Sequence, residues 1–323
     1  MPAERAAGDA VALHRYIASL LVAFGNRYHA AVAATRYISM AARILLTGAE
    51  GFTGRHLAVA AARRGYEIQE LRSNLTDAQS LMNELAETRF DYVVHLAAIS
   101  AVTHANLQEF YKVNLFGSLN LMDAILASEC APTRVLVASS ANVYGNSPLS
   151  PIGEQVCPDP LNHYAISKLA MEQMLKATAL PLVFVRPFNY TGVGHDDRFV
   201  IPKMVDHFAR RAPAIELGNM QVEREFNDVR TVVQAYLDLL ELGQAGETYN
   251  ICSGTTHSLD SVLALLSELT GHSVTARVNP DFMRPNELQR LCGDPAKLEA
   301  CIGALSHPPL SQTLEWMLQA AEA

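Results

Sequence analysis

A short apolar run followed by three regularly spaced glycines constrains the fold of this chain more than any other feature. The run "ILLT" (44–47) has the character of a buried parallel strand, and Gly48, Gly51 and Gly54 follow it. A helical stretch then continues as far as Gly65. Small residues let the backbone approach a pyrophosphate, whose charge the free N–H groups of a helix N-terminus stabilise. The pattern therefore predicts a dinucleotide site, although its spacing is G-x-x-G-x-x-G and not the usual G-x-G-x-x-G.

Strand-like and helical stretches alternate through the rest of the chain. The strand-like runs lie at 90–98, 133–140, 180–187 and 247–254, and the clearest helical stretches lie at 107–128 and 163–178. Such alternation implies right-handed βαβ units, so we predict an α/β fold with a doubly wound parallel Rossmann sheet. In sheets of this kind ligands bind beyond the carboxyl ends of the strands, and the segments that finish strands are the ones to search for chemistry.

Composition and charge exclude several classes of protein. Of the 323 residues, 50% are hydrophobic and 18% charged, which is typical of a globular chain with a substantial core. The formal charge is −8 and like charges form no block, so we expect neither a nucleic-acid partner nor a membrane surface. Five scattered cysteines without C-x-x-C indicate a reducing, cytoplasmic compartment. The 11 histidines show no H-E-x-x-H, and no metal site is predicted.

The first 39 residues precede the pattern of the fold. Their apolar run at 16–24 is far too short to span a bilayer. Glu4 and Asp9 argue against the basic region of a signal peptide. We interpret residues 1–39 as an N-terminal extension, because Met40 directly precedes the first strand-like segment.

Four polar residues in two segments suggest hydride transfer at a carbonyl. Ser139 and Ser140 lie at the end of the run at 133–140, and Tyr164 and Lys168 share one face of the following helix. As hydride reaches carbon, charge builds on oxygen, which then needs a proton donor. A phenol of pKa about 10 donates poorly in a reversible reaction at neutral pH, but a nearby ammonium is expected to lower that value. A serine hydroxyl would orient the carbonyl.

Each of these residues also has an ordinary structural explanation. The serines could simply end a strand, and Tyr164 and Lys168 could form a solvated helix face. Either explanation is preferable for a residue taken singly. Their order and spacing together favour the catalytic interpretation.

Seven segments resemble a known family: "TGAEGFTG", "HLAA", "VNLFGSLNLM", "SSANVYG", "HYAISK", "RPFNYTGVG" and "YNICSG". From residue 41 to about residue 320 the chain resembles the extended short-chain dehydrogenases/reductases that act on nucleotide sugars. The resemblance implies that Ser140, Tyr164 and Lys168 are catalytic, with Lys168 also holding the nicotinamide ribose. It implies a set of cofactor-binding residues that comprises Gly48, Gly51, Phe52, Thr53, Gly54, Arg72, Asn74, Leu75, Leu96, Ala97, Ala98, Asn114, Tyr164, Lys168 and Pro187.

The segment "QELRSN" (69–74) bears on the choice of cofactor. Relatives that use NAD usually end the second strand with an acidic residue that binds the ribose 2′-hydroxyl, whereas an arginine suits the 2′-phosphate of NADP. Arg72 therefore favours NADP(H). Glu70 lies close enough in sequence to leave NAD(H) possible, and Arg72 could also be an ordinary solvated strand end.

The distal half resembles the branch that reduces the 4-keto group of GDP-4-keto-6-deoxy-mannose. This resemblance rests on the segments at 186–200, 218–236, 248–254 and 279–288. It implies a GDP-sugar substrate bound by Ser140, Asn189, Phe199, Val200, Lys203, Arg224, Arg284 and Glu287. Planar guanidinium groups suit a diphosphate. Without the resemblance, Arg224 would be a surface ion pair with a neighbouring glutamate, and Arg284 with Glu287 a helix-start ion pair.

The two residues that follow the expected catalytic serine limit which reactions are possible. Relatives that dehydrate the sugar typically carry acidic residues there, whereas this chain has Ala141 and Asn142. We therefore expect reduction of a 4-keto-6-deoxy GDP-hexose by NAD(P)H. A 4-epimerase with tightly bound NAD is the first rival, and a non-catalytic NADP-binding sensor is the second.

The resemblance also implies a division into domains and an oligomeric state. Residues 40–188 with 226–252 would form the Rossmann domain, and residues 189–225 with 253–323 the smaller nucleotide-sugar-binding domain. Two segments break the family pattern, because His163 replaces a proline and "SHPP" (306–309) replaces a tryptophan-containing turn. Relatives dimerise through helices that match 107–128 and 163–178, so a homodimer is expected.

Overall fold

The computed structural model describes residues 41–100, 106–282 and 289–322. The fold belongs to the compact unit Ala42–Ala323. The extension expected over residues 1–39 lies outside the described residues.

Six parallel strands form the main sheet, in the order β10-β5-β4-β3-β1-β2. Their bounds are β1 Arg43–Thr47, β2 Glu67–Glu70, β3 Tyr92–His95, β4 Arg134–Ala138, β5 Leu182–Pro187 and β10 Thr248–Ile251. The strand order reverses beside β1, whose neighbours are β2 and β3. This topology confirms the predicted doubly wound α/β fold and places a switch point at the end of β1.

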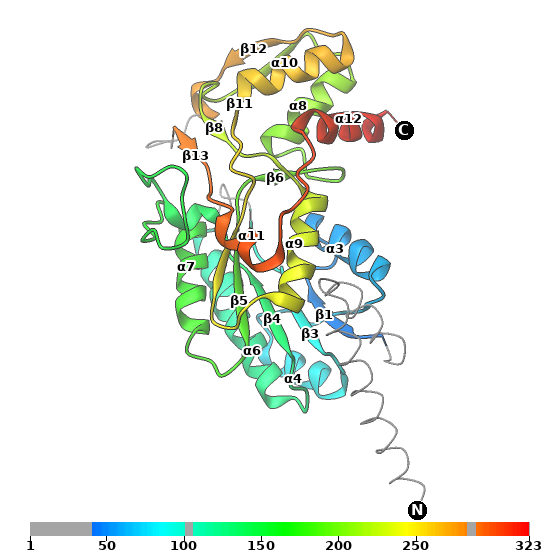
Figure 1. The fold of residues 1–323 in the computed structure, drawn as a ribbon, viewed down its shortest axis with the longest axis vertical. Helices are drawn as coiled ribbons and strands as arrows, with labels where there is room; N and C mark the ends of the chain where they lie inside the picture. Colours follow the sequence, from blue (N-terminus) through cyan, green and yellow to red (C-terminus); the bar gives the residue numbers. More distant parts are fainter. Residues whose placement is uncertain (1–40, 101–105, 283–288, 323) are drawn as a thin grey trace, which may run out of the picture. The chain divides into compact units, whose positions relative to one another are not determined.

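Helices cover both faces of the sheet. Successive strand residues point to opposite faces, and because both sets are apolar here, both faces need to be covered. Ile44, Leu46 and Leu136 belong to the core beneath one face, and Leu45 and Val135 belong to the core beneath the other. The first face carries α3 (Phe52–Arg63), α9 (Val229–Leu242) and α11 (Ala296–Ile302). The second carries α4 (Ala78–Glu87), α6 (Ser118–Ala127) and α7 (His163–Leu175), as Figure 1 shows.

The helical stretch predicted at 107–128 is in fact three joined pieces. A single turn, α5 (Leu107–Glu109), leads into the π-helical segment η2 (Phe110–Gly117), which continues as α6. The Ser118 hydroxyl donates to the carbonyl of Asn114 at 2.7 Å within this wider turn. π-helical turns are frequent at functional sites, and here the turn carries Asn114.

A second, separate core holds the distal elements together. It is built by α8 (Val200–Ala209), β7 (Ala214–Leu217), α10 (Leu259–Thr270) and α12 (Leu310–Ala321) around Phe208, Leu266 and Leu314. The remaining elements are η3 (Ala141–Tyr144), β6 (Tyr190–Thr191), β8 (Glu223–Arg224), β9 (Asn227–Asp228), β11 (His257–Ser258), β12 (Thr275–Val278), η4 (Pro280–Phe282) and β13 (Arg290–Leu291). The exact domain boundaries stay a prediction.

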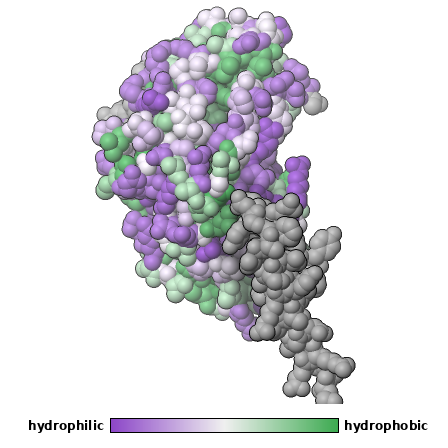
Figure 2. Space-filling view, in the orientation of Figure 1, coloured by the Kyte–Doolittle hydropathy of each residue, from purple (hydrophilic) through white to green (hydrophobic). Residues whose placement is uncertain are grey.

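The surface mixes polar and apolar side chains. On the face drawn in Figure 2, hydrophilic and hydrophobic residues are interspersed over the described part of the chain. Within that part, no helix has both the length and the apolar character that a membrane span would need.

The second core should respond to truncation of a buried leucine side chain as other cores do. Leu314 is fully buried, so Leu314→Ala is expected to lower the free energy of unfolding by about 2–5 kcal/mol. Leu269, 38% exposed on α10, gives the matched control, and Leu269→Ala should cost about 0.5 kcal/mol or less. Urea unfolding followed by circular dichroism would measure both. Equal effects would show that this core is loosely packed.

Candidate active site

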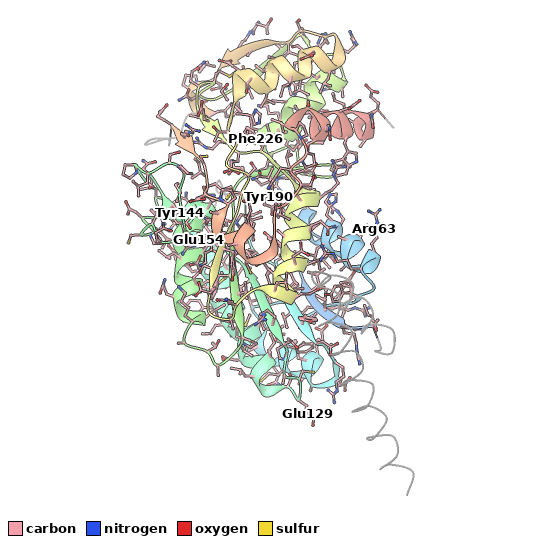
Figure 3. All side chains as sticks on the ribbon, viewed as in Figure 1. Arg63, Glu129, Tyr144, Glu154, Tyr190 and Phe226 are labelled. Atoms are coloured by element: carbon pink, nitrogen blue, oxygen red, sulfur yellow. The ribbon has the colours of Figure 1, made fainter. Side chains whose placement is uncertain are left out.

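A cleft of about 890 Å³ opens at the carboxyl ends of the strands. Fifteen of the residues predicted from the sequence line it: Gly48, Gly51, Phe52, Thr53, Gly54, Leu96, Ala98, Ser140, Tyr164, Lys168, Pro187, Asn189, Phe199, Val200 and Arg224. Its other walls include Tyr190 and Phe226, which are labelled in Figure 3. The structure thus brings together segments that lie far apart in the sequence.

Two glycines of the phosphate loop, Gly48 and Gly54, have no room for a side chain. Gly48 has a φ of +72°, and a Cβ atom there would lie 2.9 Å from the nitrogen of Ala97. A Cβ atom on Gly54 would lie 2.1 Å from the carbonyl oxygen of Gly48. Gly51 is the N-cap of α3, and it lines the cleft together with Phe52, Thr53 and Gly54 of the first turn, so the N-terminus of this helix lies at the cleft. This geometry fits the pyrophosphate of a dinucleotide.

A chain of buried hydrogen bonds fixes the loop from behind. Thr47 Oγ1 accepts from the amide of Ala97 at 3.1 Å and lies 2.7 Å from His95 Nδ1. His95 Nε2 lies 2.8 Å from the hydroxyl of Ser118, which itself donates to Asn114. The pattern assigns the proton of the neutral ring to Nε2. Burial and, to a smaller extent, the charge of Lys168 lower the pKa of His95 to about 3.

Asn114 lies outside the lining of the cleft, although the sequence placed it among the cofactor residues. Its Oδ1 accepts from the amide of Ile99 at 2.8 Å, and its Nδ2 donates to Ile99 O and to Ser167 Oγ, both at 3.1 Å. The side chain therefore ties the loop after β3 to α7. Ala97 also lies behind the lining, where it contacts Gly48.

The end of β2 is organised by a glutamate that the sequence did not single out. Glu84 Oε1 accepts from the amide of Arg72 at 2.9 Å, and Oε2 accepts from the amide of Ser73 at 2.7 Å. Burial alone would raise the pKa of Glu84, but bonds from Ser73 and Arg72 bring it below its usual value. Arg72 is exposed and, like Asn74 and Leu75, lies outside the lining of the cleft.

The first two turns of α7 carry Tyr164 and Lys168. Asn162 caps this helix, since its Oδ1 accepts from the amide of Ala165 at 2.9 Å, and Tyr164 lies in the first turn. Lys168 follows one turn later and donates from Nζ to the carbonyl of Ala138 at 2.6 Å. Both side chains are buried, and both line the cleft.

Burial dominates the ionisation of both groups. It raises the pKa of Tyr164 to about 12, against a smaller lowering by a hydrogen bond with Ser140. It lowers the pKa of Lys168 to about 8, against a raising by the charge of Glu172. We expected the ammonium to lower the pKa of the phenol, and in the structure that pKa moves the other way. The reason is desolvation, which disfavours the phenolate form of a side chain as buried as Tyr164.

Ser140 begins the short helix η3 at the end of β4. Its Oγ accepts from the amide of Asn142 at 3.2 Å, which fixes the side chain beside Tyr164. Ala141 and Asn142 line the cleft at the two following positions. Asn142 therefore presents an amide to the cleft, at a position where we expect a carboxylate in dehydrating relatives.

The residues expected to bind substrate divide into three groups. Asn189, Phe199, Val200 and Arg224 line the cleft. Lys203 does not, because its Nζ donates to the carbonyl of Glu216 at 2.7 Å. Arg284 and Glu287 lie outside the described residues.

The glutamates beside Arg224 have partners of their own. Glu223 pairs with Arg290 at 3.3 Å. Glu225 is buried and accepts from the amides of Gly293 and Ser253, each at 2.7 Å. Arg224 Nη1 donates at 2.9 Å to the backbone carbonyl of Glu223, which holds the guanidinium at the cleft.

An aromatic stack forms another wall that the sequence did not reveal. The ring of His195 lies 4.4 Å from that of Phe52 and 4.3 Å from that of Phe199. Burial lowers the pKa of His195 to about 4. Tyr190, whose hydroxyl lies 2.7 Å from Thr53 Oγ1, extends this wall. The segment "RPFNYTGVGH" carries two of these rings, but only the fold shows that they face the phosphate loop.

Among the residues that the structure describes, no group of three or more His, Cys, Asp or Glu side chains could hold a metal ion.

Residues 44–252 match the model of the NAD dependent epimerase/dehydratase family, so the chain belongs to this family. Together with the relatives described next, this makes it an NAD(P)-dependent oxidoreductase. The phosphate loop and the buried Tyr164–Lys168 pair are the parts of the site that fit such a cofactor.

Relatives agree with this assignment over most of the chain. GDP-6-deoxy-D-talose 4-dehydrogenase of Aggregatibacter actinomycetemcomitans is 34% identical and covers 81% of this chain and 91% of its own length. GDP-6-deoxy-D-mannose reductase of Pseudomonas aeruginosa is 34% identical and covers 86% of this chain and 97% of its own. The solved structure of RMD from Pseudomonas aeruginosa complexed with NADPH is 32% identical, with a TM-score of 0.81 and coverage of 87% and 99%.

The buried His95 should make stability depend on pH. Its pKa is about 3 in the fold and 6.5 in the unfolded chain, so stability is complete above pH 6.5 and falls as pH drops. From pH 7 to pH 5 this group alone should cost about 2 kcal/mol, since each pH unit is worth about 1.4 kcal/mol. Urea titrations at pH 5, 6 and 7 would measure this loss. Between pH 7 and pH 5 the free energy of unfolding of His95→Gln should fall by about 2 kcal/mol less than that of the wild type. An equally steep loss in the variant would contradict the assignment.

Proposed function

We propose that the protein reduces the C4 ketone of a GDP-4-keto-6-deoxy-hexose to the corresponding GDP-6-deoxy-hexose, such as GDP-D-rhamnose. The observation that carries the proposal is the convergence of Ser140, Tyr164 and Lys168 in one cleft beside a phosphate loop. The names of the two curated relatives, both of GDP-6-deoxy-hexose enzymes, support the substrate class.

In the proposed reaction Ser140, Tyr164 and Lys168 have different roles. When bound, NADPH would supply the hydride that reduces C4. Ser140 donates a hydrogen bond to the carbonyl oxygen and orients it, and Tyr164 transfers its proton to that oxygen as charge develops. With a pKa of about 12, the phenol carries its proton at neutral pH, which suits the reductive direction. Lys168, held at the end of β4, binds the nicotinamide ribose and supplies positive charge near the phenol.

The carboxylates of the cleft support reduction over dehydration. Among the described residues, the acidic side chains that line it are Glu50 and Asp196. Glu50 belongs to the phosphate loop, and Asp196 is paired with Arg198 at 2.7 Å. Neither follows Ser140, where an elimination of the C6 hydroxyl would need an acid or base.

We propose NADPH as the preferred cofactor. Arg72 follows β2, at the position where a 2′-phosphate would lie, and its backbone is held by Glu84. The solved relative with NADPH supports this choice. NADH remains the alternative because Glu70 ends the strand.

Turnover can be measured by absorbance at 340 nm with freshly made GDP-4-keto-6-deoxy-mannose and NADPH. We expect one NADPH oxidised per sugar, and a loss of about 10²–10⁴-fold in kcat for Tyr164→Phe with NADPH binding retained. Asn142→Ala, which changes a cleft residue without a proposed proton-transfer role, is the control and should retain turnover. Flat absorbance with interconversion of two sugars would favour the 4-epimerase, and binding without either reaction would favour the sensor.

We also propose a homodimer formed through η2 and α7. These segments pack together and expose Phe116 (54%), Ile166 (38%) and Met174 (37%). Apolar side chains exposed on adjacent helices are typical of a contact surface. Because all five cysteines are free thiols, we further propose a cytoplasmic location.

Light scattering after gel filtration tests the dimer. The wild type should have twice the mass of the chain, and Phe116→Glu should shift it toward the monomer because burying a carboxylate there is costly. Leu269→Glu, at an exposed position of α10, is the control and should stay dimeric. A monomeric wild type, or a dimeric Phe116→Glu, would reject this interface.

A further inference from the structure

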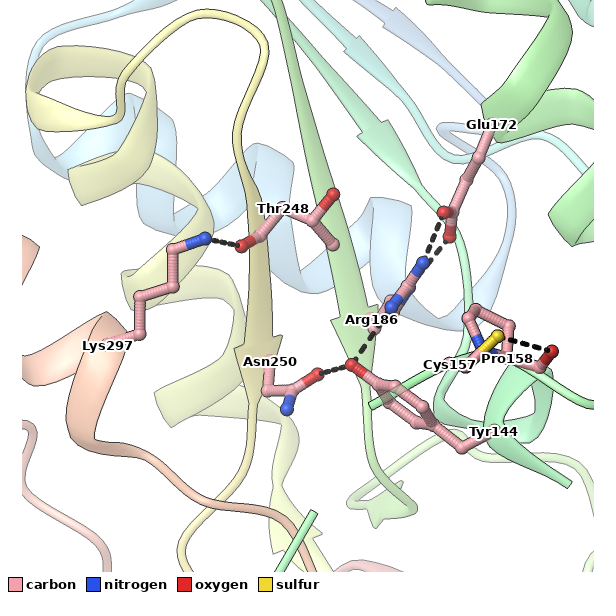
Figure 4. Close-up of polar contacts among 8 residues, drawn as sticks. All are labelled: Tyr144, Cys157, Pro158, Glu172, Arg186, Thr248, Asn250 and Lys297. Carbon is pink, nitrogen blue, oxygen red and sulfur yellow. Dashed lines mark hydrogen bonds and ion pairs between the residues drawn. The ribbon is translucent and has the colours of Figure 1, made fainter. Parts of the chain in front are cut away.

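A buried ion pair joins α7 to β5 beneath the proposed site. Arg186 Nε donates to Glu172 Oε1 at 3.0 Å, and Nη2 donates to Oε2 at 2.6 Å. The two side chains are 5% and 0% exposed. This fork-to-fork geometry satisfies both carboxylate oxygens, and Figure 4 shows it.

The pair continues into two further buried residues. Arg186 Nη1 donates to the hydroxyl of Tyr144 at 3.0 Å, and the guanidinium lies 4.9 Å from the centre of that ring. The Tyr144 hydroxyl donates in turn to Asn250 Oδ1 at 2.7 Å. Asn250 Nδ2 donates to the carbonyl of Ile152 at 2.9 Å. Glu172, Arg186, Tyr144 and Asn250 together form what we call the clamp (Figure 4).

Three of the four clamp residues lie next to residues of the site on the same segment of the chain. Glu172 lies one turn after Lys168 on α7. Arg186 precedes Pro187, where β5 meets the cleft. Tyr144 ends η3, whose N-cap is Ser140. The clamp therefore links the three segments that must stay in register for proton transfer.

A contribution to the stability of the fold is a poor explanation for the buried Glu172–Arg186 pair. Taking two charges out of water is costly, and replacing a buried ion pair by apolar residues of similar volume is often neutral or stabilising. The pair lies where α7, β5 and η3 meet. Two hydrogen bonds in a fixed planar geometry hold these segments in one orientation better than an apolar contact would.

We propose that the Glu172–Arg186 pair, with Tyr144, is a positioning device: it holds α7 against β5 and η3 and sets the electrostatic surroundings of Lys168. The proposal rests on the role that the proposed function gives to Ser140, Tyr164 and Lys168. None of the clamp residues touches the substrate or the cofactor in this account.

The charge of Glu172 affects the ionisation of Lys168 in a definite direction. The negative charge of Glu172 raises the pKa of Lys168 against the larger lowering by burial, so it favours the ammonium. Lys168 interacts with the neutral ring of His95, and Tyr164 interacts with the neutral phenols of Tyr190 and Tyr236. The charge of Arg186 is directed to Glu172 and Tyr144. The carboxylate of Glu172 is thus the group that supports the charge on Lys168.

The decisive variant removes both charges and keeps the volume. Glu172→Met/Arg186→Met should fold, with its melting temperature within a few degrees of wild type. We expect kcat to fall about 10–100-fold, the cost of a misplacement of about 1 Å, while KM for the sugar changes less than about threefold. Arg64→Met/Asp238→Met is the matched control, because that 2.6 Å pair joins α3 and α9 on the other face of the sheet. It should leave kcat unchanged.

A second readout requires no turnover. NADPH affinity, followed by fluorescence from pH 6 to pH 10, should fall in the wild type as Lys168 loses its proton near pH 8. In the double variant that fall should begin at lower pH, whereas the control should match the wild type. Because no sugar is present, this result stands whether or not the proposed reduction is correct. An unshifted pH profile in a folded variant overturns the electrostatic claim.

A milder variant covers the case in which the double variant does not fold. Tyr144→Phe removes one hydroxyl and leaves the ring over Arg186. We expect kcat to fall about 5–10-fold with NADPH affinity unchanged, because a single hydrogen bond of the clamp is lost. A folded Tyr144→Phe or double variant with wild-type kcat would overturn the proposal.

Discussion

The hydrogen bond from Lys168 Nζ to the carbonyl of Ala138 is the interaction on which the rest of the site depends. An ammonium that is almost wholly buried is costly, and this 2.6 Å bond at the end of β4, together with the carboxylate of Glu172, offsets part of that cost. The bond also fixes α7 relative to the central strand. Tyr164, one turn earlier, is thereby placed beside Ser140.

The phosphate loop depends on the same edge of the sheet. Gly48 and Gly54 pack so closely that only glycine fits, and Thr47 and His95 tie the loop to the end of β3. The phosphate loop follows β1 and the Tyr164–Lys168 pair is held at the end of β4, so both lie at one edge of the same sheet with β3 between the two strands. In the proposed reaction, this arrangement lets a helix, a loop and a strand end from distant parts of the sequence act on one carbonyl group.

The sequence was sufficient for the parts that have a periodic or local signature. Alternating strands and helices predicted the sheet, and the glycines after β1 and the Tyr164–Lys168 spacing predicted two walls of the cleft. The roles of His95, Glu84 and Glu225 could not be predicted, because a single buried polar residue has no pattern until its tertiary partners are known. The direction of the Tyr164 pKa shift could not be predicted either, because the degree of burial is known only from the finished fold. Burial raises this pKa and outweighs the effect expected from a nearby charge.

The most direct test of the account follows the hydrogen itself. With NADPH deuterated at both positions of C4 of the nicotinamide and GDP-4-keto-6-deoxy-mannose, mass spectrometry and NMR should find one deuterium at C4 of the sugar for each cofactor oxidised. Deuterium that stays on the cofactor, or a sugar product formed without any cofactor oxidised, would contradict a reductase built on Ser140, Tyr164 and Lys168.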